Sequence, residues 1–449
     1  MRRSLASLLA GPAILAFAPA IAPAEPPRPA GKPAPAVPPP DQPANSAGPA
    51  QPRKAGQFID SLGVNFNPGR GDCQFNKDQD ALLALGLRHI RAVFQSDVDW
   101  ETAYARYNAL AAGGVRATLS FHDGDAATFV HRLQRNMPAA VEAVEGWNEP
   151  DGRLVGWDAR RIFENQRELY LAVDGDAALG AAGRNIPIIG PSILADGVAR
   201  SAFTLGIASF MDYSNAHVYP NWDRDNDKDG PRNPDPPEGN PAMMYMLHRV
   251  AAAAAPGRET VITETSVAGG RRGLFNDGDW AGIYAPRLLL VEARRTARPG
   301  VRTFYYHLYD FGDKWGGLYG ADHSTLRPEG RAIRNLIAVL KDAAQGDFQA
   351  APLNYRFIDS EPGTLQSQLF QKHNGDYYLA LWRALPATDP HTSANVTVTF
   401  TGFTPVTAVR YAQLEEPGFN PDGSTLTPSA RMTINVGNRV QIVKLTGRH

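Results

Sequence analysis

Short runs of β-branched and aromatic residues alternate with helix-like segments from about residue 57 to residue 343, and this alternation limits the folds open to the chain. Strands separated by helices pair in parallel, because each helix returns the chain to the same end of the sheet. Eight strands and a closing helix are predicted at 58–66, 87–94, 115–122, 139–149, 186–190, 211–220, 259–265, 301–307 and 330–341. Eight such units predict an α/β fold of the (β/α)8 TIM barrel type, which takes about 250 residues.

After about Ala350 the helix-like pattern stops and short alternating runs follow. They lie at 365–371, 377–382, 396–400, 406–411, 432–436 and 440–445. Short strands with turn residues between them are typical of a β-sandwich. The residues before the first barrel strand and those at 353–358 could add strands to it. We therefore expect a barrel over residues 55–345 and a C-terminal β-sandwich domain over residues 346–449.

The first 54 residues are expected to lie outside both domains. Two arginines after Met1, an apolar stretch at 5–17 and Ala-Pro-Ala at 22–24 predict a signal peptide over residues 1–24. An uncleaved membrane anchor is the alternative. Residues 25–54 are dominated by Pro and Ala, which predicts a disordered linker. We expect a secreted or periplasmic protein whose N-terminal segment would bring it close to a membrane or wall, with the linker holding the folded domains away from that surface.

Two glutamates mark the ends of predicted barrel strands. Glu149, in Trp-Asn-Glu-Pro, is expected to end the fourth strand, and Glu264, in Thr-Glu-Thr, the seventh. The carboxyl ends of barrel strands meet on one face, so the two side chains are expected to face each other. Paired carboxyl groups cleave glycosidic bonds, one protonating the leaving oxygen while the other attacks the sugar or activates water. A solvated surface turn is the structural alternative for Glu149.

The sixth run ends in His-Val-Tyr. Trp-Asn-Glu-Pro, then His-x-Tyr, then Thr-Glu, in this order, resembles glycoside hydrolase clan A, the retaining glycosidases built on an eight-stranded α/β barrel. It looks most like family 39 and related exopolysaccharide-associated glycosidases, over roughly residues 57–343. The resemblance implies that Glu149 is the acid/base, Glu264 the nucleophile and Asn148 a contact to the sugar 2-hydroxyl. It also implies that His217 and Tyr219 line the cleaved subsite, one of them bonding the nucleophile.

Further residues are expected to bind substrate because of their places in the barrel. Arg91, in the second run, could point inward beside Glu264 or form a buried ion pair with Glu145. Histidines end the third and eighth runs, and tryptophans in loop-like sequence could stack on sugar rings or pack into the core. The residues expected to contact substrate are Asn148, His217, Tyr219, Arg91, His122, Tyr306, His307, Trp280 and Trp315.

No cofactor and no metal site are expected. The Asp-rich segment 223–230 resembles a calcium loop, but position twelve from Asp225 is Pro236, where an EF-hand needs glutamate. An irregular calcium site stays open as the alternative. Cys73 is the only cysteine, and no His/Cys cluster suggests zinc. The formal net charge of −1 argues against nucleic acid as a partner. We expect a monomer that binds a poly- or oligosaccharide.

These observations predict a retaining glycoside hydrolase that cleaves a polysaccharide, such as an exopolysaccharide or cell-envelope glycan, by double displacement. Retention requires the two carboxyl groups to lie about 5 to 5.5 Å apart. A raised pKa is expected for Glu149, because an acid catalyst must hold its proton. The alternatives are an exo-acting glycosidase such as a β-xylosidase, and a catalytically silent glycan-binding protein.

Overall fold

The computed structural model describes residues 49–94, 99–122, 124–152, 155–174, 186–219, 237–238, 241–267, 280–295, 301–311, 317–344, 346–361, 363–386 and 393–448. The expected signal peptide, most of the expected linker, the Asp-rich segment 223–230 and Trp315 lie outside the described residues. No helix within these ranges combines the length and apolar character needed to cross a membrane.

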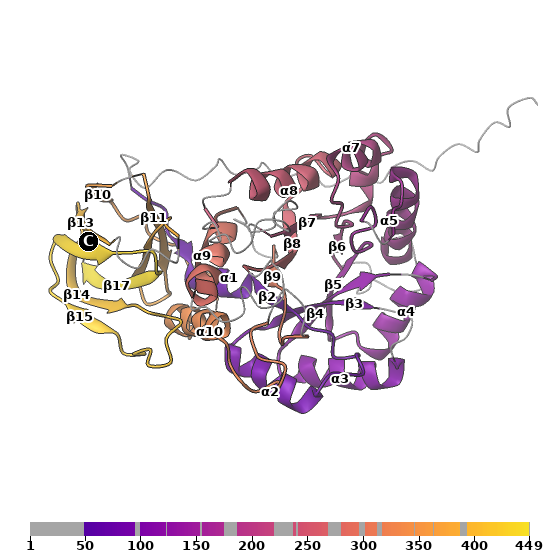
Figure 1. The fold of residues 1–449 in the computed structure, drawn as a ribbon, viewed down its shortest axis with the longest axis horizontal. Helices are drawn as coiled ribbons and strands as arrows, with labels where there is room; N and C mark the ends of the chain where they lie inside the picture. Colours follow the sequence, from indigo (N-terminus) through magenta and orange to yellow (C-terminus); the bar gives the residue numbers. More distant parts are fainter. Residues whose placement is uncertain are drawn as a thin grey trace, which may run out of the picture. The chain divides into compact units, whose positions relative to one another are not determined.

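Eight parallel strands form the predicted TIM barrel (Figure 1). They are β2 (Leu62–Asn65), β3 (His89–Phe94), β4 (Arg116–Phe121), β5 (Val141–Glu145), β6 (Ile188–Ile189), β7 (Ser214–Val218), β8 (Thr260–Thr265) and β9 (Thr303–Tyr305). Their hydrogen-bonded order is β6-β5-β4-β3-β2-β9-β8-β7. A parallel bridge between Ile189 and Tyr213 joins the two ends of this order. The barrel is therefore confirmed, with β6 as its shortest strand.

Helices follow the strands and surround them (Figure 1). They are α2 (Phe75–Leu85), α3 (Trp100–Ala112), α4 (Ala126–Asn136), α5 (Ala159–Asp174), α7 (Asp196–Thr204), α8 (Pro241–Ala254), α9 (Trp280–Arg295) and α10 (Pro328–Leu340). Capping residues, glycine and proline determine where several of these helices begin or end. Asp125 caps α4 by accepting the Thr128 N–H, α2 ends at Gly86 with φ of +82°, and Pro328 opens α10.

Two predicted strands have different bounds in the structure. The first run, 58–66, begins as helix α1 (Ala55–Asp60), and only Leu62–Asn65 are extended. Phe58 is buried in α1, and an apolar side chain suits a buried helix as well as a buried strand, so it did not distinguish the two. The fourth run ends as a strand at Glu145, and Glu149 lies in the turn that follows. Glu149 has a φ of 44°, which an extended strand cannot accommodate.

Two sheets, antiparallel except for the pairing of β1 with β11, form the C-terminal β-sandwich, as predicted. One contains β10 (Tyr355–Asp359), β13 (Ala394–Phe400) and β16 (Arg431–Val436). The other contains β1 (Arg53–Lys54), β11 (Leu365–Gln371), β12 (Tyr377–Arg383), β17 (Gln441–Arg448), β14 (Thr404–Tyr411) and β15 (Ser424–Leu426). Inward-facing apolar side chains of both sheets pack into one core that includes Val396, Leu379 and Val443.

The end of the expected linker belongs to this sandwich. Strand β1 pairs in parallel with β11, and Ala50 forms an antiparallel bridge to Leu353. Residues before the barrel thus add a strand, and β10 covers the second segment expected to do so. The prediction of a disordered linker up to residue 54 was wrong at its end, because backbone pairing with β11 orders Arg53 and Lys54. A truncated protein should therefore start at residue 49 rather than 55.

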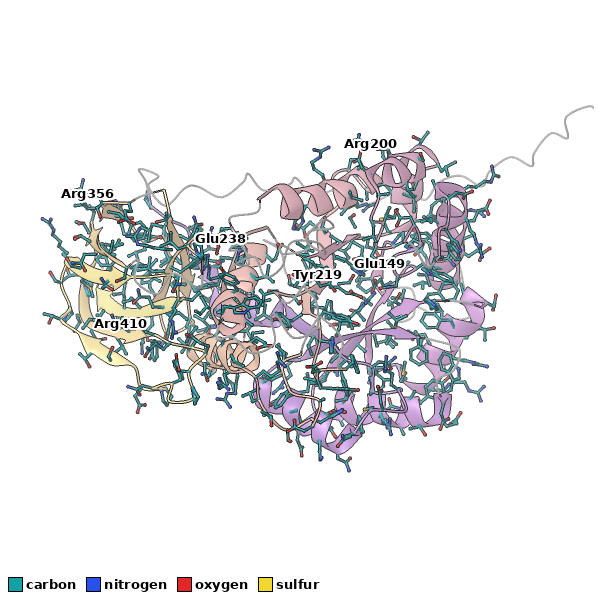
Figure 2. All side chains as sticks on the ribbon, in the orientation of Figure 1. Glu149, Arg200, Tyr219, Glu238, Arg356 and Arg410 are labelled. Carbon is teal, nitrogen blue, oxygen red and sulfur yellow. The ribbon has the colours of Figure 1, made fainter. Side chains whose placement is uncertain are left out.

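Arg287 of α9 connects the barrel to the sandwich. Its side chain is fully buried, and Nη1 donates to Leu385 O at 2.8 Å and to Asn438 O at 3.3 Å. Glu238, which follows β7, accepts from Arg287 and from Trp382 Nε1 on β12. Figure 2 shows Glu238 at the side of the barrel next to the sandwich. One buried ion pair thus joins three parts of the chain.

Replacing Arg287 with alanine should lower the free energy of unfolding by about 3 to 5 kcal/mol, because Glu238 would remain buried without its cation. Denaturant unfolding measures the change. Arg160→Ala is the control, since Arg160 forms an exposed pair with Glu164 within α5 and should hardly matter. Equal effects of the two substitutions would contradict a stabilising role for the buried pair.

Candidate active site

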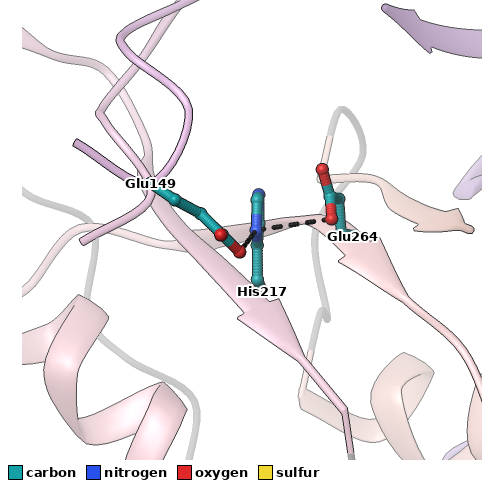
Figure 3. A group of neighbouring side chains, drawn as sticks. All are labelled: Glu149, His217 and Glu264. Carbon is teal, nitrogen blue, oxygen red and sulfur yellow. Dashed lines mark hydrogen bonds and ion pairs between the residues drawn. The ribbon is translucent and has the colours of Figure 1, made fainter. Parts of the chain in front are cut away.

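The two predicted glutamates meet at the carboxyl ends of the barrel strands. Glu264 is part of β8, and its neighbour in the register of β7 is His217. Glu149 follows β5 and reaches the same place from its turn. Figure 3 shows the imidazole of His217 between the two carboxylates. Parallel strand ends thus bring together groups that are far apart in the sequence, as the barrel requires.

Short distances separate these three side chains. His217 Nδ1 lies 2.8 Å from Glu149 Oε1 and 3.5 Å from Glu264 Oε2. One oxygen of Glu149 and one oxygen of Glu264 lie within 4.8 Å of each other. This separation is below the roughly 6.5 to 9.5 Å at which a water molecule fits between two catalytic carboxyl groups.

Glu264 receives a hydrogen bond on each carboxylate oxygen. Arg91 Nη1 donates to Oε1 at 2.6 Å, and the Tyr219 hydroxyl donates to Oε2 at 2.7 Å. Burial, followed by the negative charge of Glu264, raises the pKa of Tyr219 well above its usual value. The tyrosine therefore remains a neutral donor. These two bonds fix the Glu264 carboxylate in one orientation.

Arg91 is buried and uses all five N–H donors on the protein. Nε and Nη2 bind Glu145 at 2.8 and 2.7 Å, Nη2 also binds Asn148 at 2.6 Å, and Nη1 binds Asn65 and Glu264. Both roles that the sequence left open, a neighbour of Glu264 and a partner of Glu145, are present. The guanidinium has no N–H left to donate to a substrate, so the expected substrate contact is absent. Arg91 instead holds Glu264 and Asn148 in place.

Glu149 is more open to solvent than Glu264. The exposed fractions of the two side chains are 30% and 11%. Glu149 also departs from ordinary backbone geometry, with its φ of 44°, and its N–H donates to Ser192 Oγ at 2.8 Å. The side chain of Glu149 can therefore meet a group that enters from solvent, while Glu264 lies deeper.

The charges of the site shift the pKa values of Glu149 and His217 in opposite directions. Burial favours a raised pKa for Glu149, but the hydrogen bond and charge of His217, together with Arg91, lower its pKa overall. Burial favours a lowered pKa for His217, but the charges of Glu264 and Glu149 and the bond to Glu149 raise it overall. The expected rise in the pKa of Glu149 was therefore wrong for the protein without substrate, because His217 and Arg91 together outweigh the effect of burial.

The remaining predicted residues lie at different distances from this pair. Asn148 stays near it, with Oδ1 bound to Arg91. His122 stacks on Trp147, their ring centroids 4.6 Å apart, and Tyr306 is half-buried beside His307. His307 is buried and stacks on Phe311, and its contact with substrate stays a prediction.

Trp280 is the first residue of α9. It packs against Tyr284 edge-to-face, with centroids 5.8 Å apart, and against the core of the barrel. The indole therefore packs on the core, one of the two roles that the sequence left open, and its stacking on a sugar stays a prediction. Trp147 and Trp157 form the aromatic contact nearer to Glu149, with centroids 3.9 Å apart.

A buried polar network that the sequence analysis did not identify supports the site. Asn215 Nδ2 donates to Glu145 Oε1 at 2.9 Å, and its Oδ1 accepts from Thr263 Oγ1 at 2.6 Å. Asn65 Nδ2 donates to Thr263 O at 2.9 Å. An asparagine within a predicted barrel strand was the signal that could have indicated both Asn65 and Asn215, because buried amides need partners.

Glu149, His217 and Glu264 also have the donor types that could hold a metal ion. Both oxygens of Glu264 already accept hydrogen bonds, and the Arg91 cation lies against one of them. A cation bound there would meet the repulsion of that guanidinium. The arrangement therefore suits carboxylate chemistry better than metal ligation.

Comparisons with solved structures agree with the fold. The chain is similar to a family 51 α-L-arabinofuranosidase from Bifidobacterium longum, with 11% identity, a TM-score of 0.57, and coverage of 90% of this chain and 99% of that chain. It is also similar to a GH51 arabinofuranosidase from Xanthomonas axonopodis pv. citri, with 12% identity, a TM-score of 0.57 and coverage of 89% and 98%. A thermostable GH51 α-L-arabinofuranosidase from Thermotoga petrophila RKU-1 has 10% identity, a TM-score of 0.58 and coverage of 90% and 98%.

No protein-family model matches the chain, and no curated protein matches its sequence. At these low identities, the solved structures establish the fold, a TIM barrel with a C-terminal β-sandwich, over both domains.

Proposed function

We propose that the chain is a retaining glycoside hydrolase in which Glu264 is the nucleophile and Glu149 the acid/base. The observation that carries the proposal is the close approach of the two carboxylates, whose oxygens lie within 4.8 Å. Retaining glycosidases hold their carboxyl groups about 5 to 5.5 Å apart, because one of them must reach the anomeric carbon directly. The fold similarity to glycosidases supports the same reading.

The reaction takes two steps on these residues. In the first, Glu149 protonates the glycosidic oxygen while Glu264 attacks the anomeric carbon, and a glycosyl ester forms on Glu264 as the leaving group departs. In the second, Glu149 takes a proton from water, and that water breaks the ester at the same carbon. Two inversions leave the configuration retained. Arg91 and Tyr219 keep the Glu264 carboxylate oriented for attack.

His217 lets Glu149 act as an acid although the pKa of the carboxyl is lowered. The imidazole and the carboxylate are 2.8 Å apart and titrate as a pair. Between the lowered pKa of Glu149 and the raised pKa of His217 the pair holds one proton, which is shared along the hydrogen bond. Glu149 can pass this proton to the leaving oxygen, because His217 donates it to Glu149 across the hydrogen bond. The pair therefore keeps an acid available at pH values above the ordinary pKa of a carboxyl group.

His217→Asn should move the basic limb of the pH-rate profile to lower pH. In the wild-type protein the raised pKa of His217 keeps the shared proton bound above the ordinary imidazole range. In the variant Glu149 alone must hold the proton, so activity should be lost about 1 to 2 pH units earlier, as the ordinary pKa values of His and Glu suggest. The profile of kcat/KM measures this limb.

His131→Asn is the matched control, since His131 is an exposed histidine of α4. Its basic limb should coincide with that of the wild-type protein. An unchanged limb in His217→Asn would contradict the shared-proton pair, even if the rate itself fell.

The proposed substrate is a polysaccharide, either an exopolysaccharide or a cell-envelope glycan. Two features of the sequence support it: the motif order that resembles family 39, and the signal-like first 24 residues that would place the protein outside the cytoplasm, secreted or periplasmic. An exo-acting glycosidase is the second candidate, because the similar structures that span both domains are named arabinofuranosidases. A silent glycan-binding protein is the third.

One experiment separates these candidates. A protein that starts at residue 49 is incubated with a panel of bacterial and plant polysaccharides, and the products are sized. Internal cleavage gives a ladder of oligomers, exo cleavage gives a single small sugar, and a silent protein gives none. Proton NMR of the first product then reports the anomeric configuration. An initially inverted product would contradict the retaining mechanism.

A further inference from the structure

The turn that carries Glu149 has an unusual backbone. Glu149 has a φ of 44°, in the left-handed region that side chains other than glycine rarely adopt. Such residues persist where the surrounding structure holds them, at a cost of about 1 to 3 kcal/mol. The direction of the Glu149 side chain depends on this φ, because φ sets where Cβ points. What holds the turn therefore decides where the carboxyl lies.

Ser192, in the loop after β6, binds the turn at two points. Its Oγ accepts the Glu149 N–H at 2.8 Å, and its own N–H donates to Trp147 O at 3.3 Å. The side chain is fully buried, so water cannot replace it. Without the hydroxyl, the Glu149 N–H would lose its acceptor in the interior, and a buried donor without an acceptor costs free energy.

Asp151 also joins the loop after β5, in which it lies, to the loop after β6. Its Oδ1 accepts the Leu194 N–H at 2.9 Å, and its Oδ2 accepts the Ala195 N–H at 2.8 Å. Each loop thus supplies a side chain to the backbone of the other. These bonds supplement a weak ladder, since β6 has only two residues.

Gly146 shows how close the two loops are. A Cβ at this position would lie 2.9 Å from Pro191 N and 2.1 Å from Gln166 Oε1. The backbone after β5 therefore touches the backbone before Ser192, and only a residue without a side chain fits between them. This contact fixes the distance across which Ser192 reaches Glu149.

We propose that Ser192, supported by Asp151, is a positioning residue that holds the Glu149 turn in the left-handed conformation needed for proton transfer. This inference rests on the proposed function. If the turn relaxes to negative φ, the Glu149 carboxyl leaves its place 2.8 Å from His217 and no longer faces the leaving oxygen. Glu264 has separate supports in Arg91 and Tyr219, so its attack is unaffected.

The test compares two substrates of the same sugar, chosen as one that the wild-type protein hydrolyses. A 2,4-dinitrophenyl glycoside has a leaving group that departs without a proton, whereas an alkyl glycoside needs one. Ser192→Ala should lower kcat on the alkyl glycoside about tenfold or more, as a partial loss of the 10²- to 10⁴-fold that general acid catalysis contributes. The first step on the dinitrophenyl glycoside, measured as the burst of dinitrophenol, should change less than threefold.

Controls separate positioning from loss of structure. Ser201→Ala removes a hydroxyl on α7 that donates to Gly197 O, and both substrates should react at wild-type rates. Asp151→Asn should act like Ser192→Ala but more weakly, since the Asn oxygen keeps one of the two backbone bonds. The NMR titration of the His217 imidazole adds a readout: in Ser192→Ala it should shift toward that of Glu149→Gln.

Each result bears on the inference. Equal loss on both substrates in Ser192→Ala, or no loss on either with an unchanged His217 titration, would overturn it. Failure of the wild-type protein to hydrolyse any glycoside would instead overturn the proposed function, and the inference with it. The two failures are distinguishable because the first requires an active wild-type protein.

Discussion

Glu264→Ala is expected to reduce turnover by about 10⁴-fold or more, the largest loss of any single substitution in this protein. No other described carboxylate can form the glycosyl ester, because Glu149 lies on the leaving-group side and Glu145 is fully buried in its pair with Arg91. Arg91 and Tyr219 would also lose an acceptor that they now share. Steady-state hydrolysis of any substrate that the native protein cleaves measures the loss.

Azide makes the Glu264→Ala result specific. The small anion fits the space of the missing carboxylate and can attack the anomeric carbon once, so the product should be a glycosyl azide of inverted configuration. Glu164→Ala is the control, since Glu164 is an exposed residue of α5 and should keep full activity. Normal turnover in Glu264→Ala would remove Glu264 from the mechanism.

Glu149→Ala is expected to produce a loss that depends on the leaving group. Substrates whose leaving oxygen needs a proton should react about 10² to 10⁴ times more slowly, because that is the usual contribution of general acid catalysis. Activated aryl glycosides should still form the glycosyl ester, and the ester should then accumulate, because no base activates water. A burst of aryl alcohol followed by slow turnover is the measurement.

Azide should rescue Glu149→Ala with the opposite stereochemistry. It enters where the acid/base carboxyl was and attacks the glycosyl ester, so the azide product should have retained configuration. Equal loss on activated and unactivated substrates would contradict the acid/base role of Glu149. Wild-type rates in both glutamate variants would favour another site altogether.

The barrel and its two glutamates could be predicted because they depend on local patterns. Strand runs that alternate with helix-like segments indicate parallel pairing, and parallel pairing places strand ends such as Glu264 on one face. Helix α1 could not be predicted in the same way, because the Phe58-Ile59 pair suits a helix and a strand equally well. Short apolar runs carry no period that distinguishes the two.

The finer geometry of the site depends on contacts between distant residues. The bond from His217 to Glu149 joins β7 to the turn after β5, and its effect on both pKa values follows from that meeting. Ser192 looks in the sequence like any serine after Gly-Pro, and only the approach of the two loops gives it a role. A left-handed φ at Glu149 has no sequence signal, since glutamate does not favour that region.

The pairing of β1 with β11 affects the order in which the protein can be completed during synthesis. Arg53 is made early, but its partner Phe370 follows roughly 300 residues later. At about 5 to 20 residues per second, the ribosome needs roughly 15 to 60 seconds to supply β11. Strand β1 has no partner during that time, while the barrel between β1 and β11 is being made. The β-sandwich, which is made after the barrel, therefore secures a strand that precedes the barrel, so a nascent chain that stops before β11 leaves β1 open to pair with another molecule.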